Sequence, residues 1–223
     1  MSADDFNLFA RFARPFADRP DDELLTTGAG DVWSYRDVDT LSARIAAALT
    51  GAGVGPGDRV SAQIAKSPEG LCLYLACLRA GFVFHPLNPA YKAAELEYFI
   101  GNAEPRAVIA DPGNAGTLAP FADAAGAGEV LTLDADGGGS LSALAAGSEP
   151  DFTVLPRARD DLAALLYSSG TTGVPKGIML SHDNLLSNTE SLVEAWGFTR
   201  ADRLLHALPI FHVHGLFVGI GCA

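Results

Sequence analysis

The chain has 223 residues, which is long enough for one large domain or two small ones with a sizeable core. Hydrophobic residues account for 48% of the sequence and charged residues for 19%, proportions that argue against disorder of the whole chain. The formal net charge of −12 argues against binding of nucleic acid, because that requires a basic surface that neutralises phosphates. A site for anions in this acidic chain would therefore depend on local donors.

In the first 111 residues, the apolar positions alternate between helical and strand periods. Ser67 and Pro68 are typical of the start of a helix, and Gly81 is typical of its end. The repeated succession of strand and helix predicts a parallel sheet covered by helices. In chain order, the predicted elements are helix 34–53, strand 57–65, helix 67–79, strand 82–87, helix 92–103 and strand 106–111.

The most apolar segment, residues 70–88, is interrupted by an arginine, a glycine and a proline. This pattern favours a buried helix followed by a strand over a membrane span, so we expect no membrane contact. Cys72, Cys77 and Cys222 have no metal-ligand spacing and are typical of core residues in a reduced protein. The sequence thus predicts a cytoplasmic protein in which the cysteines bind no metal.

The second half of the chain begins with a looser region. Residues 111–156 are rich in Gly, Ala and Asp, and we expect them to form connections and surface helices. A further helix is predicted to begin near Ser181. The sequence stops in the apolar run 216–223, so we expect the chain to be part of a larger domain. The strands predicted beyond residue 160 are 162–167, 177–180 and 203–208.

A polar, glycine-rich loop separates the first two of these strands. Gly170 and Gly173 allow positive φ angles and a close approach of the backbone to a ligand. Successive backbone N–H groups in such a turn suit phosphate oxygens, and Lys176 supplies a mobile positive charge. We therefore predict a site for a polyphosphate here. Further hydrogen-bond donors are the hydroxyl side chains of Ser168, Ser169, Thr171 and Thr172.

The loop has two other interpretations, a P-loop and a hairpin turn without a ligand. The common P-loop ends in Gly-Lys-Ser/Thr and runs into a helix, whereas Lys176 follows Pro175 and precedes a predicted strand. A kinase or GTPase of that type is therefore disfavoured. A polar β-hairpin turn without a ligand would explain two glycines, but it does not explain the whole string of glycines, hydroxyls and lysine.

The stretch YSSGTTGVPKG, residues 167–177, resembles the signature loop of adenylate-forming enzymes, which include acyl-CoA synthetases, luciferases and peptide-synthetase adenylation domains. The stretch LPIFHVHG, residues 208–215, is similar to a second conserved segment in the form usual for acyl-CoA synthetases. The resemblance implies an α/β fold of parallel-rich β-sheets packed with helices. It also implies that residues 1–223 are the N-terminal portion of the large AMP-binding domain, without the small C-terminal domain. Within them, approximately 1–160 would form a first α/β portion and 161–223 the portion that carries the loop.

In this family a carboxylate attacks the α-phosphorus of ATP, which gives an acyl-adenylate and pyrophosphate, and the thiol of coenzyme A then displaces AMP. The resemblance therefore implies ATP, Mg²⁺ and coenzyme A as cofactors and co-substrates, with a small carboxylic acid as partner. It places the β- and γ-phosphates of ATP in the loop from Ser168 to Lys176. Thr171 and Thr172 would be the principal hydroxyl donors, and Lys176 the counter-charge.

Two histidines of the second stretch are candidate site residues. His212 matches a family position near the carboxylate and the α-phosphate, where a ring N–H can hold either anion, so it is the candidate catalytic residue. His214 is expected to line the acyl pocket. A polar side chain there suits the distal carboxylate of a dicarboxylic acid, since an apolar pocket makes burial of that charge costly. His85 and His206 lie in strand-like runs and are expected to be structural.

Two longer stretches, residues 73–112 and 206–218, are similar to malonyl-CoA synthetases, which favours malonate or methylmalonate as the acid. A fatty or aryl acid is the alternative substrate, and a non-catalytic nucleotide-binding module is the alternative function. The family's magnesium-binding glutamate, ribose-binding aspartate and adenylation lysine have no match in the sequence. We therefore expect the 223 residues alone to bind nucleotide weakly and to be inactive.

Overall fold

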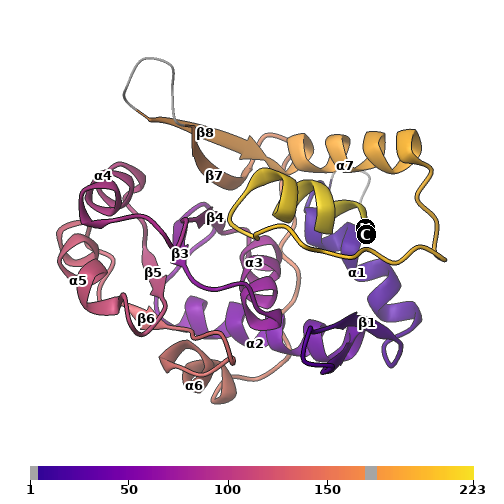
Figure 1. Cartoon of the computed structure of the whole chain (residues 1–223), viewed down its shortest axis with the longest axis horizontal. Coiled ribbons are helices and arrows are strands. Elements are labelled where there is room, and N and C mark those ends of the chain that lie inside the picture. Colours follow the sequence, from indigo (N-terminus) through magenta and orange to yellow (C-terminus); the bar gives the residue numbers. More distant parts are fainter. Residues whose placement is uncertain (1–4, 169–174) are drawn as a thin grey trace.

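The computed structural model describes residues 5–168 and 175–223. In this part of the chain a six-stranded sheet lies at the centre, helices cover both of its faces, and a two-stranded sheet lies to one side (Figure 1). The helices are α1 (Leu8–Asp18), α2 (Tyr35–Gly51), α3 (Pro68–Ala80), α4 (Ala93–Ala103), α5 (Ala115–Ala124), α6 (Ser140–Ala146), α7 (His182–Trp196) and the π-helix η1 (His214–Ile220). The strands are β1 (Glu23–Thr26), β2 (Val32–Ser34), β3 (Arg59–Gln63), β4 (Val83–Pro86), β5 (Ala107–Ala110), β6 (Leu131–Thr132), β7 (Leu162–Ser168) and β8 (Lys176–Ser181).

The central sheet has the strand order β6-β5-β3-β4-β7-β8. Neighbouring strands are parallel from β6 to β7, and the last pair, β7 and β8, is antiparallel. The predicted α/β fold with a parallel-rich sheet is confirmed. Because β7 is parallel to β4, its carboxyl end at Ser168 points toward the same edge of the sheet as the carboxyl ends of β3, β4 and β5.

The alternation of side chains along each strand divides the core between the two faces of the sheet. On β5, Ile109 packs into the cluster that contains α2 and α3, whereas Val108 packs with α4 and α5 on the other face. Both side chains are almost completely buried. A parallel sheet has this covering because its crossover helices must lie on the faces of the sheet.

The segment with the clearest local signals folds as predicted. Ser67 caps α3, its hydroxyl oxygen accepting a hydrogen bond from the N–H of Gly70. Gly81 follows α3 with φ of 69°, a left-handed conformation that favours glycine, and a Cβ there would lie 2.8 Å from Cδ of Arg157. The predicted buried helix and strand within residues 70–88 are therefore confirmed as α3 and β4. Among the described helices, none is both long enough and apolar enough to cross a bilayer.

The strand predicted at 203–208 is wrong, because these residues form no regular secondary structure. Leu205 is 93% exposed, so its place in an alternating apolar pattern does not reflect burial. The segment is held through its carbonyl groups by the side chain of Lys66, rather than by a neighbouring strand. Short elements that the sequence pattern did not predict are α1, β1, β2 and β6.

The start of α7 connects the β7–β8 hairpin to the first helix. The predicted helix near Ser181 is α7, and Ser181 caps it, its Oγ accepting from the N–H of Asn184 at 3.2 Å. His182 follows and is buried, and its Nδ1 accepts a hydrogen bond of 3.1 Å from the N–H of Leu8 at the start of α1. Burial lowers the pKa of His182 to about 4, because a charged ring would lose its hydration. The neutral ring therefore connects α1 to the end of β8.

This buried histidine predicts a pH dependence of stability. The pKa of His182 is about 4 in the folded chain and near the ordinary 6.5 in the unfolded chain, so between these values only the unfolded chain binds the proton. The free energy of unfolding should fall as the pH decreases from 6.5 toward 4. In His182→Asn the side-chain oxygen can still accept from the N–H of Leu8, but the titrating ring is gone. We therefore expect the free energy of unfolding of this variant to fall less than that of the wild type between pH 6.5 and 4. Urea unfolding at stepped pH measures it.

The control for this experiment is His212→Asn, which changes an exposed histidine. That variant should show the same decline as the wild type. Equal slopes for wild type and His182→Asn would contradict the role assigned to the buried ring.

Candidate active site

The β7–β8 hairpin carries the described part of the predicted phosphate site. Ser168, the last residue of β7, lies opposite Lys176, the first residue of β8. Ser168 is half-buried and the Lys176 side chain is exposed. The two residues are the ends of the connection between β7 and β8. The other predicted phosphate-binding residues lie outside the described part of the chain. They are Ser169, Gly170, Thr171, Thr172 and Gly173.

The hairpin ends lie where an α/β sheet commonly binds ligands. In open α/β sheets, ligands occupy the space beyond the carboxyl ends of the parallel strands. Ser168 is at the carboxyl end of β7, on the same edge of the sheet as Gln63 of β3 and Pro86 of β4. The topology therefore places the predicted phosphate site at the edge where a nucleotide is expected.

An aromatic cluster supports the hairpin from α4. The Tyr167 ring contacts Phe99 of α4, with 4.7 Å between centroids, and its hydroxyl donates a hydrogen bond of 2.6 Å to Oδ1 of Asn102. Burial raises the pKa of Tyr167 to about 12, so the hydroxyl stays protonated and donates. The hydroxyl of Tyr98 donates to the carbonyl oxygen of Pro175 at 2.9 Å. Our sequence reasoning did not identify Tyr98 or Asn102.

The two candidate histidines lie together at the start of η1. His212 and His214 are both exposed and line one hollow of about 300 Å³. The His212 ring packs against Phe211, with 4.8 Å between centroids. A π-helix is rare and often occurs at functional sites, and His214 is the first residue of this one. The remaining residues that line the hollow are Leu208, Pro209, Val213 and Gly215.

Backbone contacts fix the shape of this hollow. A Cβ on Gly215 would lie 2.0 Å from the carbonyl oxygen of Pro209, so the chain can pass there only with glycine. Nε2 of His206 lies 2.9 Å from the carbonyl oxygen of Gly215 and donates to it. Burial lowers the pKa of His206, which keeps the ring neutral with one N–H for this bond. His206 thus contacts the backbone of the hollow from a segment without regular secondary structure, and not from the strand that its position predicted.

The Lys66 side chain holds the backbone of the segment that precedes His212. It lies between β3 and α3, and its Nζ donates to the carbonyl oxygens of His206 and of Leu208, the latter at 3.0 Å. Burial lowers the pKa of Lys66. No local sequence signal could have identified this contact, because Lys66 and His206 are 140 residues apart in the chain.

The structure brings the candidate residues into two groups rather than one. Ser168 and Lys176 face each other across the hairpin, and His212 and His214 share the hollow. The second group packs on α3 through η1, whose Phe217 ring lies 5.8 Å from the Tyr74 ring of that helix. No hydrogen bond or ion pair connects the two groups within residues 5–168 and 175–223.

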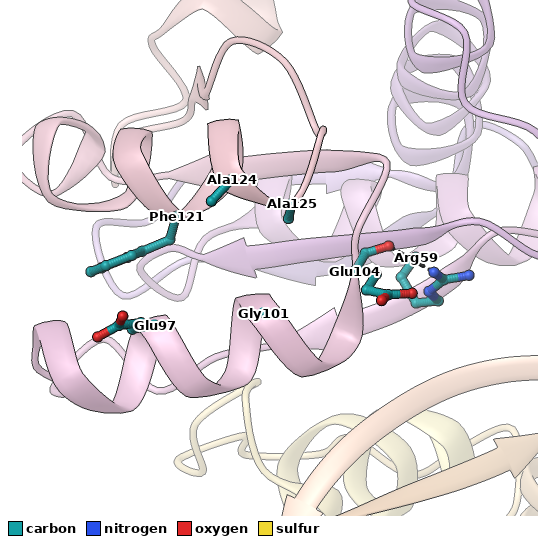
Figure 2. Close-up of a pocket in the computed structure, with 7 residues that line it drawn as sticks. All are labelled: Arg59, Glu97, Gly101, Glu104, Phe121, Ala124 and Ala125. Atoms are coloured by element: carbon teal, nitrogen blue, oxygen red, sulfur yellow. Dashed lines mark hydrogen bonds between the residues drawn. The ribbon is translucent and has the colours of Figure 1, made fainter.

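A larger hollow of about 560 Å³ lies between α4 and α5 (Figure 2). Phe121 and Glu97 extend into the space between the two helices, and Arg59 donates hydrogen bonds of 2.7 Å to the carbonyl oxygens of Ala103 and Glu104. Arg59 is the first residue of β3, so this hollow lies at the amino ends of the strands. None of the predicted site residues lines it.

A parallel-rich sheet between helices, with both motif-bearing segments at the carboxyl ends of the strands, is the architecture of the N-terminal part of adenylate-forming enzymes. The family model described as AMP-binding enzyme matches residues 12–223. The chain belongs to this family.

Solved structures and curated relatives agree with this assignment. The crystal structure of apo MatB from Rhodopseudomonas palustris is 50% identical, with a TM-score of 0.93, and the match covers 98% of this chain and 43% of MatB. The 4-coumarate–CoA ligase CCL1 of Humulus lupulus is 32% identical over 90% of this chain and 38% of its own. The oxalate–CoA ligase of Arabidopsis thaliana is 31% identical over 96% of this chain and 42% of its own. The chain thus spans about two fifths of the length of the relatives it matches.

The close contact at Gly215 predicts the effect of a single added methyl group. We expect Gly215→Ala to lower the free energy of unfolding by about 2 kcal/mol or more, because the Cβ meets a backbone oxygen that cannot turn away. The matched control is Gly116→Ala in α5, where a Cβ meets nothing within 4 Å and alanine favours the helix. Urea unfolding of both variants checks the prediction, and equal stability of the two would contradict it.

Proposed function

We propose that this chain forms the N-terminal part of the large domain of an ATP-dependent acid–CoA ligase and holds the phosphates of ATP near Ser168 and Lys176. The observation that carries the proposal is the facing pair of hydroxyl and ammonium side chains at the carboxyl edge of the sheet, in a chain of the AMP-binding enzyme family. The intervening residues Ser169, Gly170, Thr171, Thr172 and Gly173 complete the proposed phosphate site.

The proposed reaction has two steps. A carboxylate oxygen attacks the α-phosphorus of ATP and pyrophosphate leaves; the thiol of coenzyme A then attacks the acyl carbon of the adenylate and AMP leaves. The first step brings two anions together, so donors that spread the charge of the phosphates lower its barrier. In this proposal Lys176 supplies a positive charge, and the hydroxyls and backbone N–H groups of the loop supply neutral donors.

Mg²⁺ enters this proposal only with the phosphates of ATP. Within the described residues, no group of three His, Cys, Asp or Glu side chains could hold a metal ion. In this proposal none of the described residues is a metal ligand.

His212 is proposed as the residue that holds the reacting carboxylate or the α-phosphate. Its exposed ring lies at the hollow, where an N–H can donate to an anionic oxygen. The neighbouring His214 is proposed to face the rest of the acid. A second imidazole in the same hollow suits a substrate with a second carboxylate, because a polar lining reduces the cost of burying that charge.

The proposed acid is malonate or methylmalonate. Two stretches of the sequence, 73–112 and 206–218, support it by their similarity to malonyl-CoA synthetases. The identity of 50% with MatB, a malonyl-CoA synthetase, is above the 36% with 4-coumarate–CoA ligase 5 of Oryza sativa and the 37% with the feruloyl-CoA synthase of Amycolatopsis, which weighs against an aryl acid. Polar histidines in the hollow also weigh against a long aliphatic chain.

The proposed phosphate site predicts the effect of removing one charge. We expect Lys176→Ala to raise the Kd for ATP about tenfold, the loss of one charge-assisted hydrogen bond. Lys92→Ala removes an exposed charge of the same sign from the start of α4 and should leave the Kd within about twofold. Isothermal calorimetry on the 223-residue chain compares the two. A Kd unaffected by Lys176→Ala would show that the phosphates bind elsewhere.

The proposed substrate predicts a ranking of acids in the complete ligase. We expect kcat/KM for malonate to exceed that for 4-coumarate and octanoate, and His214→Leu to lower the malonate value about tenfold by making burial of the distal carboxylate more costly. The Kd for ATP should not change in that variant. Release of pyrophosphate with each acid gives the measurement. A higher kcat/KM for octanoate or 4-coumarate would contradict the dicarboxylate.

A further inference from the structure

We propose that α4 positions the two ends of the phosphate-binding hairpin, with Tyr98 and Asn102 as the positioning residues. This inference rests on the proposed function, since it concerns the placement of Ser168 and Lys176. Tyr98 and Asn102 are four residues apart and therefore lie on the same face of the helix, one turn from each other.

Each of the two residues contacts one strand of the hairpin. The Tyr98 hydroxyl donates to the carbonyl oxygen of Pro175 at 2.9 Å, directly before Lys176. The Asn102 Oδ1 accepts from the Tyr167 hydroxyl at 2.6 Å, directly before Ser168. One turn of α4 thus holds the residue adjacent to each of the two proposed phosphate ligands.

The hairpin needs this support because its ends extend beyond the neighbouring strand. Phe84 of β4 pairs with Ala164 of β7, and β4 ends only two residues later at Pro86. In this register Tyr167 and Ser168 lie beyond the end of β4, and their strand partners are on β8 alone. Since β8 is the edge of the sheet, the support on the β4 side comes from α4.

The contact with Pro175 acts on the direction of Lys176. The carbonyl of Pro175 and the N–H of Lys176 belong to one planar peptide group. A hydrogen bond from Tyr98 to that carbonyl therefore fixes the plane from which Lys176 begins. Proline also restricts its own φ, so few backbone angles remain to be set.

The Tyr167 side is fixed by ring packing as well as by the hydrogen bond. Its ring contacts Phe99 of α4 at 4.7 Å and His85 of β4 at 5.3 Å between centroids. His85 is itself buried and held by Ser61, with 2.8 Å between Nδ1 and Oγ. Burial lowers the pKa of His85 to about 3, so the ring against Tyr167 is neutral. These contacts hold the Tyr167 side chain and backbone in place, and they therefore restrict the position of Ser168, the next residue in the chain.

A phosphate site held in its binding geometry before the ligand arrives costs less ordering entropy on binding. We therefore expect loss of either contact to weaken ATP binding without changing the charge of the site. Tyr98→Phe removes only the hydroxyl and should raise the Kd for ATP about threefold to tenfold, the effect of one hydrogen bond. Asn102→Ala should have an effect of similar size.

The matched control is Tyr91→Phe. The Tyr91 ring packs on the same Phe99, with 4.9 Å between centroids, but no hydrogen bond from its hydroxyl to the described part of the hairpin is present. Tyr91→Phe should keep the Kd for ATP within about twofold of the wild type. In the complete ligase, Tyr98→Phe should raise the KM for ATP and leave the KM for the acid unchanged, a separation that a general loss of stability would not produce.

Calorimetry with ATP on the 223-residue chain distinguishes the outcomes. If the wild type binds ATP, Lys176→Ala weakens it, and Tyr98→Phe and Asn102→Ala leave the Kd within about twofold, the positioning role is overturned while the proposed function stands. If Lys176→Ala has no effect, the proposed phosphate site itself fails. If Tyr98→Phe lowers the melting temperature, the Kd of Asn102→Ala for ATP tests the positioning role instead, because the Asn102 side chain is exposed and its removal leaves the core intact. An Asn102→Ala Kd within about twofold of the wild type would then overturn that role.

Discussion

The pairing of β7 with β4 on one side and β8 on the other determines where the candidate site lies. The parallel pair directs the carboxyl end of β7 to the ligand-binding edge of the sheet, and the antiparallel pair returns the chain at once. Ser168 and Lys176 therefore face each other at that edge rather than on opposite sides of the molecule. A crossover helix after β7 would have separated them by the width of a helical layer. The hairpin is thus the constraint from which the proposed phosphate site follows.

Features set by local chemistry could be predicted from the sequence. A helix cap needs one hydroxyl and a helix end needs one residue with a positive φ, so Ser67 and Gly81, and the helix start near Ser181, could be predicted from their immediate neighbours. The parallel sheet followed from the alternation of strand and helix periods. The segment 203–208 shows where this reasoning fails: an alternating pattern is evidence for a strand only where a partner strand lies alongside, and the sequence does not show the partner.

Contacts between distant parts of the chain account for what could not be predicted in the candidate site. The motifs indicated Lys176, His212 and His214, but the residues that hold their backbone come from elsewhere. Lys66 binds carbonyls more than a hundred residues away, and the Tyr98 hydroxyl of α4 donates to the carbonyl of Pro175, 77 residues further along the chain. Each is an ordinary residue in its own segment, and only the folded arrangement gives it a partner in the site.

Lys66 also places a positive charge near the histidine hollow of an acidic chain. Its hydrogen-bond partners in the described structure are the carbonyl oxygens of His206 and Leu208, which carry no net charge. No bonded carboxylate therefore offsets the charge of the ammonium group in the described structure, and its two carbonyl partners hold the backbone beside the hollow that His212 and His214 line. In a chain of net charge −12, two anionic substrates approach an unfavourable overall potential. Lys66 at the histidine segment and Lys176 at the hairpin oppose that potential at the two groups of residues that are proposed to hold the anions.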